Sequence, residues 1–276
     1  MTGPGGEPCA SPWCQRWHAG RASWRDVRTD EAVRRGRYRA APVPEATARR
    51  YVLAHHYAKS MPAARLCFGY FDNEDGHLAG VAVLGVPMSE RVLTSAFRLE
   101  PYVESLELSR FVCGPEVPAN GESNFLGQTF ALAAEAGLRG LVCFADPVER
   151  RRADGTLVKP GHVGIIYQAT NARHAGRSTA RSLVVLPDGT VFSARAASKV
   201  RRRERGWRYG VDQLVSIGAT APQGAEDMAA WLRAALDEVG ARRFRHPGNH
   251  RYLFALGRNP RERRSVELAM AAGPYP

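Results

Sequence analysis

Apolar and polar positions along the chain form short apolar runs, typical of strands, between segments with the wider spacing of helices. Apolar runs predict strands at residues 38–43, 65–71, 78–86, 105–112, 141–144, 182–186, 190–194 and 251–256. Helices are predicted over residues 45–57, 122–137, 163–171 and 223–239. This order predicts an α/β (α+β) fold, a mixed sheet flanked by helices, with a basic C-terminal extension.

One strand–loop–helix unit narrows the fold class further. It consists of the strand at 105–112, a Pro- and Gly-rich loop at 114–121 and the helix at 122–137. The unit is similar to that of GCN5-related N-acetyltransferases, in which backbone N–H groups at the helix N-terminus bind the pyrophosphate of coenzyme A. The Q/R-x-x-G-x-G/A loop of that family is absent here. We therefore expect a GCN5-related N-acetyltransferase-like fold, and the fold alone does not predict coenzyme A.

Composition divides the chain into three parts. Residues 1–36 are rich in Gly, Pro, Arg and Trp without periodicity and are expected to form a loosely ordered extension. The residues Cys9, Cys14 and His18 resemble part of a zinc site, but the fourth ligand is missing, which favours a plain surface extension. Residues 37–194 are expected to form the catalytic domain. Residues 195–276 are expected to pack on the same domain.

The charge of the chain indicates its partner. Lys and Arg number 39 against 27 Asp and Glu, so the formal charge is +12, which favours nucleic acid or an acidic membrane surface. Half of this excess lies in residues 195–208, with the aromatic residues Trp207 within this stretch and Tyr209 directly after it. Because cations release counterions from phosphate and aromatic rings stack on bases, we predict nucleic-acid binding there. The predicted contact residues are Lys199, Arg201, Arg202, Arg203, Arg205 and Arg208.

Other features exclude several classes of protein. No run of 18 apolar residues occurs, so no transmembrane helix and no membrane partner are predicted. The N-terminus lacks the apolar core of a secretory signal. The cysteines are scattered and odd in number, which is typical of reduced thiols. We therefore expect a cytoplasmic protein.

Two segments carry residue types that suit catalysis at the ends of predicted elements. His55, His56 and Tyr57 end the first helix, where imidazole serves either in catalysis or as a cap of the helix C-terminus. Asp146 follows the strand at 141–144, at the end of a strand where α/β sheets place ligands. Its carboxylate suits a base, a metal ligand or an orienting acceptor, although Asp-Pro also forms ordinary turns.

The strand–loop–helix unit contributes further polar residues. Glu107 and Arg110 stand three positions apart on the predicted strand, so regular alternation places them on opposite faces. Only one of the two is then expected to face a cleft. Ser123 lies in the first turn of the following helix, where a hydroxyl caps the helix or holds an anion.

Residues 161–171 concentrate polar side chains around a turn of small residues. They include His162, Tyr167, Gln168 and Asn171. Asn and Gln side chains recognise the N6/N7 edge of adenine with two hydrogen bonds, and Tyr stacks on an extruded base. The alternative is a helix with an ordinary polar face.

The order of these segments resembles the Mom family of phage DNA-modification proteins, over about residues 38–209. The matching pieces are His55-His56-Tyr57, the glycines 69, 80 and 85, Glu107-Leu108-Ser109-Arg110-Phe111, Asn120-Gly121-Glu122-Ser123, Phe144-Ala145-Asp146-Pro147 and residues 161–171. The resemblance implies a GCN5-acetyltransferase-like enzyme. It also implies conversion of adenine in double-stranded DNA to N6-(carbamoylmethyl)adenine, which protects phage DNA from host restriction in the bacterial cytoplasm.

The resemblance also implies roles for individual residues. His56, Tyr57 and Asp146 match the family's essential positions, for which iron binding has been proposed, and an N/O ligand set suits iron. Asp146 alternatively accepts a proton from the adenine amine. Arg110, Ser123 and Tyr167 match positions that line the active site. His162, Gln168 and Asn171 are expected to bind the substrate base, which must be flipped out of the duplex.

The sequence leaves alternatives for the donor of the transferred group and for the function. The donor of the carbamoylmethyl group is either an acyl-CoA or a glycine-derived compound, and the oligomeric state is not predicted. Residues 148–160 form an insertion-like loop relative to the family. Two other functions compete with the modification of adenine: an acyl-CoA-dependent N-acyltransferase acting on a small amine or protein, and a non-catalytic nucleic-acid-binding module.

Overall fold

The computed structural model describes residues 13–18, 21–26, 28, 30–224 and 227–276. The side chains of the suggested zinc ligands Cys9, Cys14 and His18 lie outside the described part of the chain. The chain forms two compact units. The sheet unit takes the chain up to residue 146 together with 162–176 and 250–276, and the basic unit takes 147–161 and 177–249.

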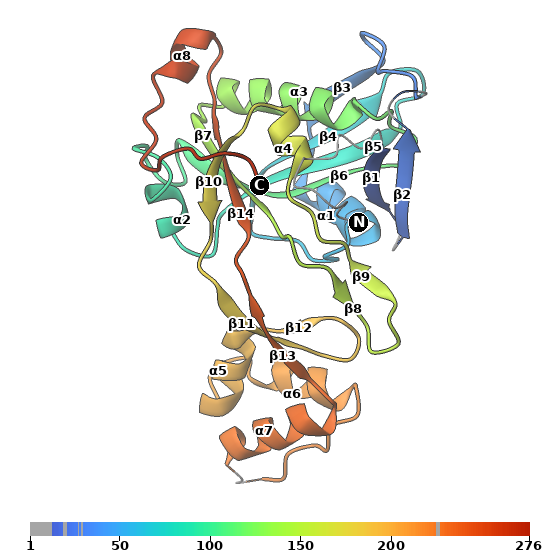
Figure 1. The fold of residues 1–276 in the computed structure, drawn as a ribbon, viewed down its shortest axis with the longest axis vertical. Coiled ribbons are helices and arrows are strands. Elements are labelled where there is room, and N and C mark those ends of the chain that lie inside the picture. Colours follow the sequence, from blue (N-terminus) through green and yellow to red (C-terminus); the bar gives the residue numbers. More distant parts are fainter. Residues whose placement is uncertain (1–12, 19–20, 27, 29, 225–226) are drawn as a thin grey trace. The chain divides into compact units, whose positions relative to one another are not determined.

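A sheet of seven strands, counted over the described residues, forms the centre of the sheet unit (Figure 1). Its strands are β3 (Tyr38–Pro42), β4 (Ala64–Asp72), β5 (Leu78–Gly85), β6 (Ser105–Cys113), β7 (Gly140–Ala145), β10 (Arg173–Arg177) and β14 (His250–Ala255). Their order across the sheet is β10-β14-β7-β6-β5-β4-β3. Strands β3 to β6 pair antiparallel, β6 and β7 pair parallel, and β7 and β14 pair antiparallel. The predicted mixed sheet is therefore confirmed.

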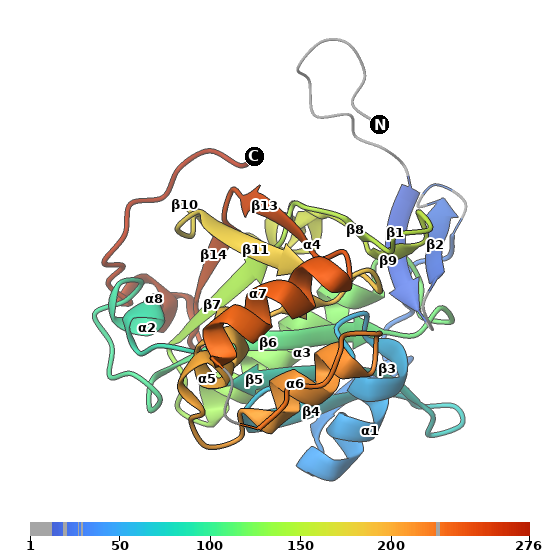
Figure 2. The ribbon, with the colours of Figure 1, turned by 90° about the horizontal axis from the view of Figure 1, so that it is seen from below.

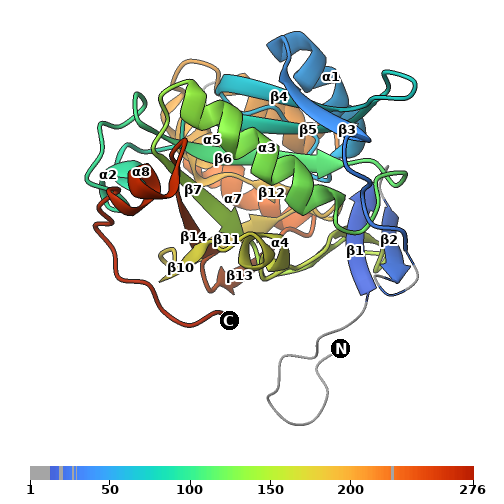
Figure 3. The same ribbon diagram turned by 90° about the horizontal axis from the view of Figure 1, so that it is seen from above.

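Helices cover both faces of this sheet. The sheet unit contains α1 (Glu45–His55), α2 (Arg91–Thr94), α3 (Gly121–Glu135), α4 (Ile165–Ala169) and α8 (Pro260–Arg264). Helix α3 crosses one face (Figure 3), where Phe125 shares a buried cluster with Leu84 of β5. Helix α1 lies on the other face, where Val52 shares a cluster with Val83 of β5. Burial on both faces explains why β5 is an uninterrupted apolar run.

The parallel pair β6–β7 separates along its length. Its paired residues run only from Ser105 opposite Gly140 to Glu107 opposite Val142. Strand β6 continues to Cys113 and β7 to Ala145 without further pairing between them. In α/β sheets, ligands bind beyond the carboxyl ends of strands where neighbours diverge. Glu107 is the last residue of β6 before this divergence.

A β-bulge in β6 corrects the predicted orientation of Glu107 and Arg110. Leu108 pairs with Leu84 and Arg110 with Val83, so Ser109 is an extra residue in β6. An extra residue reverses the alternation of all following side chains. The clusters agree with this reversal, because Leu108 packs on the α3 side of the sheet whereas Val112 packs on the α1 side. Glu107 and Arg110 therefore lie on the same face, and the prediction of opposite faces was wrong.

The basic unit has its own small sheet and its own core. Its elements are β8 (Arg150–Arg151), β9 (Leu157–Lys159), β11 (Arg181–Val185), β12 (Val191–Phe192), β13 (Arg242–His246), α5 (Ala194–Arg202), α6 (Arg208–Val215) and α7 (Met228–Glu238). Strands β12-β11-β13 form the sheet. Helices α5, α6 and α7 lie together (Figure 2) and bury Val200, Leu214 and Trp231 in one cluster with Phe192.

Several elements differ from the predictions. Residues 148–160, expected as a loop, contain the β8–β9 hairpin. Where a loosely ordered extension was expected, β1 (Trp13–His18) and β2 (Arg21–Asp26) pair as an antiparallel hairpin. The contacts also place residues 177–194 with the basic unit and 250–276 with the sheet unit, so the division differs from the expected boundary after residue 194. Within the described residues, every helix is too short or too polar to span a bilayer.

Candidate active site

The turn after α1 holds the first two predicted site residues. His56 closes the helix in an extended conformation, with its backbone N–H donating to the carbonyl oxygen of Val52 at 2.9 Å. Its side chain is buried, with 8% of the residue exposed. The ring of Tyr57 lies against it, with the ring centroids 4.2 Å apart. The backbone N–H of Ala58 donates to Nδ1 of His56 at 3.0 Å, so the neutral ring carries its proton on Nε2.

Arg110 connects this turn to β6. Its Nε donates to the carbonyl oxygen of Ser60 and its Nη2 to the Ser60 hydroxyl, each at 2.9 Å. Its Nη1 donates to the carbonyl oxygen of Ser109, the bulge residue, at 2.6 Å. The bulge therefore places the guanidinium group where it holds the turn that carries His56 and Tyr57.

The surroundings of His56 keep its imidazole neutral. Burial, and then the positive charges of Arg110 and His162, lower the pKa of His56 from 6.5 to about 3. A neutral imidazole with its proton on Nε2 donates one hydrogen bond and offers no positive charge near neutral pH.

Glu107 is a site residue that the sequence predictions did not select. Burial raises the pKa of its carboxyl group, and the nearby Arg110 and a hydrogen bond from Ser109 oppose this rise. A partly buried carboxyl group with a raised pKa beside a functional cluster is a candidate for proton transfer. The signal in the sequence was the Glu107-Leu108-Ser109-Arg110 motif, but the bulge at Ser109 is a tertiary feature.

Two buried groups, Tyr167 and Cys143, lie close enough to Glu107 to feel its charge. Tyr167 of α4 is buried, and burial followed by the neighbouring Cys143, Tyr57 and Glu107 raises its pKa well above 10. Burial, followed by the charge of Glu107, likewise raises the pKa of the Cys143 thiol. Both groups therefore stay protonated at neutral pH, and Tyr167 is available only as a neutral hydroxyl.

The segment that leads into α4 links Asp146 to this site. The backbone N–H of His162 donates to the carbonyl oxygen of Asp146 at 2.9 Å, and the charge of His162 acts on His56. Gly164 then starts α4 with φ +81°. A Cβ atom there would lie 2.7 Å from Tyr252 and 2.9 Å from Tyr167, so only glycine fits.

The structure thus brings together six titratable side chains of the sheet unit from three separate segments. We name this set the splay cluster: His56, Tyr57, Glu107, Arg110, His162 and Tyr167. It combines a carboxyl group, a guanidinium group, a neutral imidazole N–H and two phenols. These groups suit proton transfer and the binding of a polar substrate.

Three predicted residues have local structural roles, and two of them have side-chain partners. The side-chain amide of Gln168 donates to the hydroxyl of Tyr252 at 3.0 Å. Asn171 is exposed and adopts φ +62° just after α4, a conformation that Asn tolerates at helix ends. The hydroxyl of Ser123 donates to the carbonyl oxygen of Asn120 at 2.8 Å. The two hydrogen bonds and the backbone conformation of Asn171 describe local structural roles, and the predicted substrate contacts of these three residues stay predictions.

The residues present do not fit the iron site implied by the resemblance. Nδ1 of His56 accepts a hydrogen bond from Ala58 and Nε2 carries the proton, so neither nitrogen offers a lone pair to a metal. The guanidinium group of Arg110 is also close enough to act on this ring, and positive charge opposes a cation there. Over the residues that the structure describes, no three His, Cys, Asp or Glu side chains gather as metal ligands.

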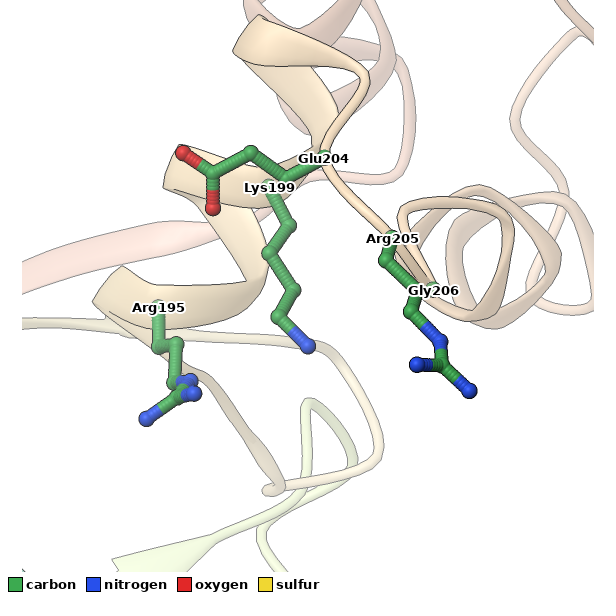
Figure 4. A pocket seen from close by; sticks show the side chains of 5 residues that line it. All are labelled: Arg195, Lys199, Glu204, Arg205 and Gly206. Carbon is green, nitrogen blue, oxygen red and sulfur yellow. The ribbon is translucent and has the colours of Figure 1, made fainter.

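The predicted nucleic-acid-binding stretch lies in the basic unit and surrounds an open hollow (Figure 4). Arg195, Lys199 and Arg205 line it and extend to the same side, whereas the Glu204 carboxylate points away. The unit as a whole holds 17 Lys and Arg against 9 Asp and Glu, a net charge of +8 out of +12. The positive charge is therefore concentrated in this unit.

Other arginines of the stretch stabilise its local structure. Arg203 ends α5 with φ +50°, and its Nη2 donates to the carbonyl oxygen of Gly224 at 2.9 Å. The guanidinium groups of Arg203 and Arg208 lie 5.6 and 5.7 Å from the ring centre of Trp207. Arg202 pairs with Glu204 at 3.6 Å. Of the predicted residues, Lys199 and Arg205 lie at the open hollow.

The fold and the splay cluster together define a mixed α/β protein with a candidate catalytic centre where a parallel strand pair diverges. Comparison with known protein families assigns the chain to one of them. The chain belongs to the Mom protein family, whose model matches residues 37–276. The seven-stranded mixed sheet agrees with the GCN5-acetyltransferase-like fold expected of this family.

Comparisons with individual proteins give weaker similarities. No curated protein matches the chain significantly. Among solved structures, the chain is similar to a tandem GNAT protein from the clavulanic acid biosynthesis pathway, solved without AcCoA. The identity is 11%, the TM-score 0.35, and the match covers 80% of this chain and 75% of that chain. It is also similar to a protein described as phosphinothricin N-acetyltransferase, with 12% identity, a TM-score of 0.32, and coverage of 54% and 86%.

Proposed function

We propose that this protein transfers a carbamoylmethyl group to N6 of adenine in double-stranded DNA. Membership of the Mom family supports this reaction. The observation that carries it is the splay cluster, in which three segments that resemble the family's motifs meet at one partly buried place. The proposal assigns the protein to the transferases, and the modified base protects DNA from restriction.

The chemistry requires a proton acceptor beside the amine. The exocyclic amine of adenine is a poor nucleophile because its lone pair is delocalised into the ring. As the new N–C bond forms, one N–H bond breaks and the donor's leaving group departs with its bonding electrons. Glu107 suits the role of acceptor because burial raises its pKa above the ordinary value of a glutamate, which makes it a stronger base, while Arg110 favours the ionised form. Asp146, next to His162, is the second carboxylate available.

The other groups of the splay cluster position the reactants. The Nε2–H of His56 and the hydroxyl of Tyr167 are neutral donors, which suit the ring nitrogens and carbonyl oxygens of a base or an amide. Arg110 supplies the positive charge for an anionic donor or leaving group. None of these roles requires a metal.

The basic unit supplies the affinity for DNA in this proposal. Its net charge of +8 suits a phosphate backbone. Inside a duplex N6 of adenine takes part in base pairing, so the adenine must first be flipped out. The sheet unit, which carries the splay cluster, then recognises the flipped base.

The experiment that tests the proposal is nucleoside mass spectrometry. The protein is expressed with a plasmid, the DNA is digested to nucleosides, and deoxyadenosine heavier by one carbamoylmethyl group is expected. Asp146 matches a position that the family resemblance implies to be essential, so the variant Asp146→Ala is expected to abolish the product while DNA binding persists. Glu90→Gln, an exposed position on the sheet unit, serves as control. Unmodified DNA from a folded, DNA-binding preparation contradicts the proposal.

A further inference from the structure

The loop between β6 and α3 is bound by the chain's own N-terminal segment. A loop that leads from a strand into a helix normally presents backbone N–H groups to an anion such as a diphosphate. Residues 114–120 form this loop here. Three residues that precede the region matched to the family, Arg16, Asp30 and Val33, contact it, and we name them the N-terminal plug.

Arg16 binds backbone carbonyl oxygens of the loop. Its guanidinium group donates to the carbonyl oxygens of Gly114 at 3.1 Å, Pro118 at 2.6 Å and Val117. It also pairs with the carboxylate of Glu122 in the first turn of α3, at 2.6 Å between Nη2 and Oε2. Arg16 is 5% exposed, so this cation is saturated with protein partners and closed to an external anion.

Asp30 binds a backbone amide of the same loop. Its Oδ2 accepts the backbone N–H of Ala119 at 2.7 Å. The backbone N–H of Val33 donates to Oδ1 of Asn120, the residue before α3, at 2.8 Å. A carboxylate of the chain thus takes the position on the loop amide where a phosphate oxygen would bind.

From these contacts we infer that the N-terminal plug closes the diphosphate position, so that the group donor is a small molecule without a nucleotide diphosphate. The statement about the donor rests on the proposed function, whereas the plug itself does not. Two carboxylates, Asp30 and Glu122, stand at the start of α3 and repel a second anion. Removing Arg16 alone would leave Glu122 buried without its partner, which is costly. The arrangement therefore selects against coenzyme A thioesters.

The first experiment measures binding of acetyl-CoA to the full chain by isothermal titration calorimetry. No binding is expected at ligand concentrations up to the millimolar range. Micromolar binding by the wild-type protein overturns the inference, whether or not adenine is modified. Conversely, absence of the modified nucleoside contradicts only the proposed function and leaves the plug in place.

The second experiment tests the plug directly by hydrogen exchange of peptides that cover residues 114–122. Asp30→Ala and the double variant Arg16→Met/Glu122→Gln are expected to raise exchange in this loop by about tenfold, as for a lost hydrogen bond to a charged group. The second variant removes both partners of the buried pair together, which keeps the fold. Glu31→Ala, an exposed side chain of the same segment, is the matched control and should change nothing. Exchange equal to wild type in both plug variants overturns the inference.

Discussion

Glu107 and Arg110 lie on the same face of β6. In a regular strand, two residues three positions apart would point to opposite faces. The extra residue Ser109 between them reverses the alternation. The carbonyl oxygen of Ser109 accepts Nη1 of Arg110 at 2.6 Å. The bulge thus gives the partly buried carboxyl group of Glu107 a cationic neighbour at the point where β6 and β7 separate.

Replacement of Glu107 by Gln is expected to separate activity from stability. The modified nucleoside should fall by about 100-fold or more, because general base catalysis contributes about that much. The fold should persist, since burial penalises the charged form of Glu107 and Gln is neutral. Mass spectrometry of nucleosides and a thermal melt measure the two effects. Full modification by Glu107→Gln would exclude this residue as the proton acceptor.

The depressed pKa of His56 makes stability depend on pH. Its folded pKa of about 3 lies below its ordinary value of 6.5, so the unfolded state binds more protons between these values. Stability therefore rises with pH in this window, and the fall from pH 8 to pH 5 costs about 2 kcal/mol from this residue. Urea unfolding of His56→Gln should show a smaller loss between these pH values. His77→Gln, at an exposed position, should keep the wild-type dependence, and the same dependence in both variants would contradict the prediction.

Gly164 is expected to tolerate no side chain. Its φ is +81°, and an added Cβ would lie 2.7 Å from Tyr252 and 2.9 Å from Tyr167. Gly137 has φ +93° with open space around it and serves as the matched control. Gly137→Ala should cost about 1 kcal/mol of unfolding free energy from backbone strain, whereas Gly164→Ala should cost clearly more because packing is added. Equal losses of unfolding free energy in the two variants, measured by chemical unfolding, would show that the turn before α4 accommodates a Cβ atom without a packing penalty.

The hollow of the basic unit predicts a change in salt dependence. Arg195, Lys199 and Arg205 extend to its open side. Replacing all three by Gln should reduce the slope of log affinity for duplex DNA against log salt by about 3 units. Fluorescence anisotropy over a salt series measures this slope. The same replacement of the exposed Arg261, Arg263 and Arg264 on α8 is the control, and a larger effect of the control would place the DNA elsewhere.

Local patterns were enough to predict most of the sheet. Continuous apolar runs predicted strands such as β5, because helices bury both of its faces and no polar alternation is required. Helices α1 and α3 were predicted from their spacing and end within two residues of the expected positions. Helix α5 was missed because its many cations mask the apolar spacing of Ala197 and Val200, and α6 was missed because it is only 8 residues long.

The sequence by itself determined the element order, the family motifs and the basic stretch, since these depend on residue types and their local spacing. The tertiary structure alone decided that Glu107 joins Arg110, because a bulge is set by pairing with β5. It also decided that Arg16 and Asp30 occupy the loop before α3, a contact across about ninety or more positions of sequence. Such contacts depend on how distant segments pack, and a local pattern carries no information about that packing.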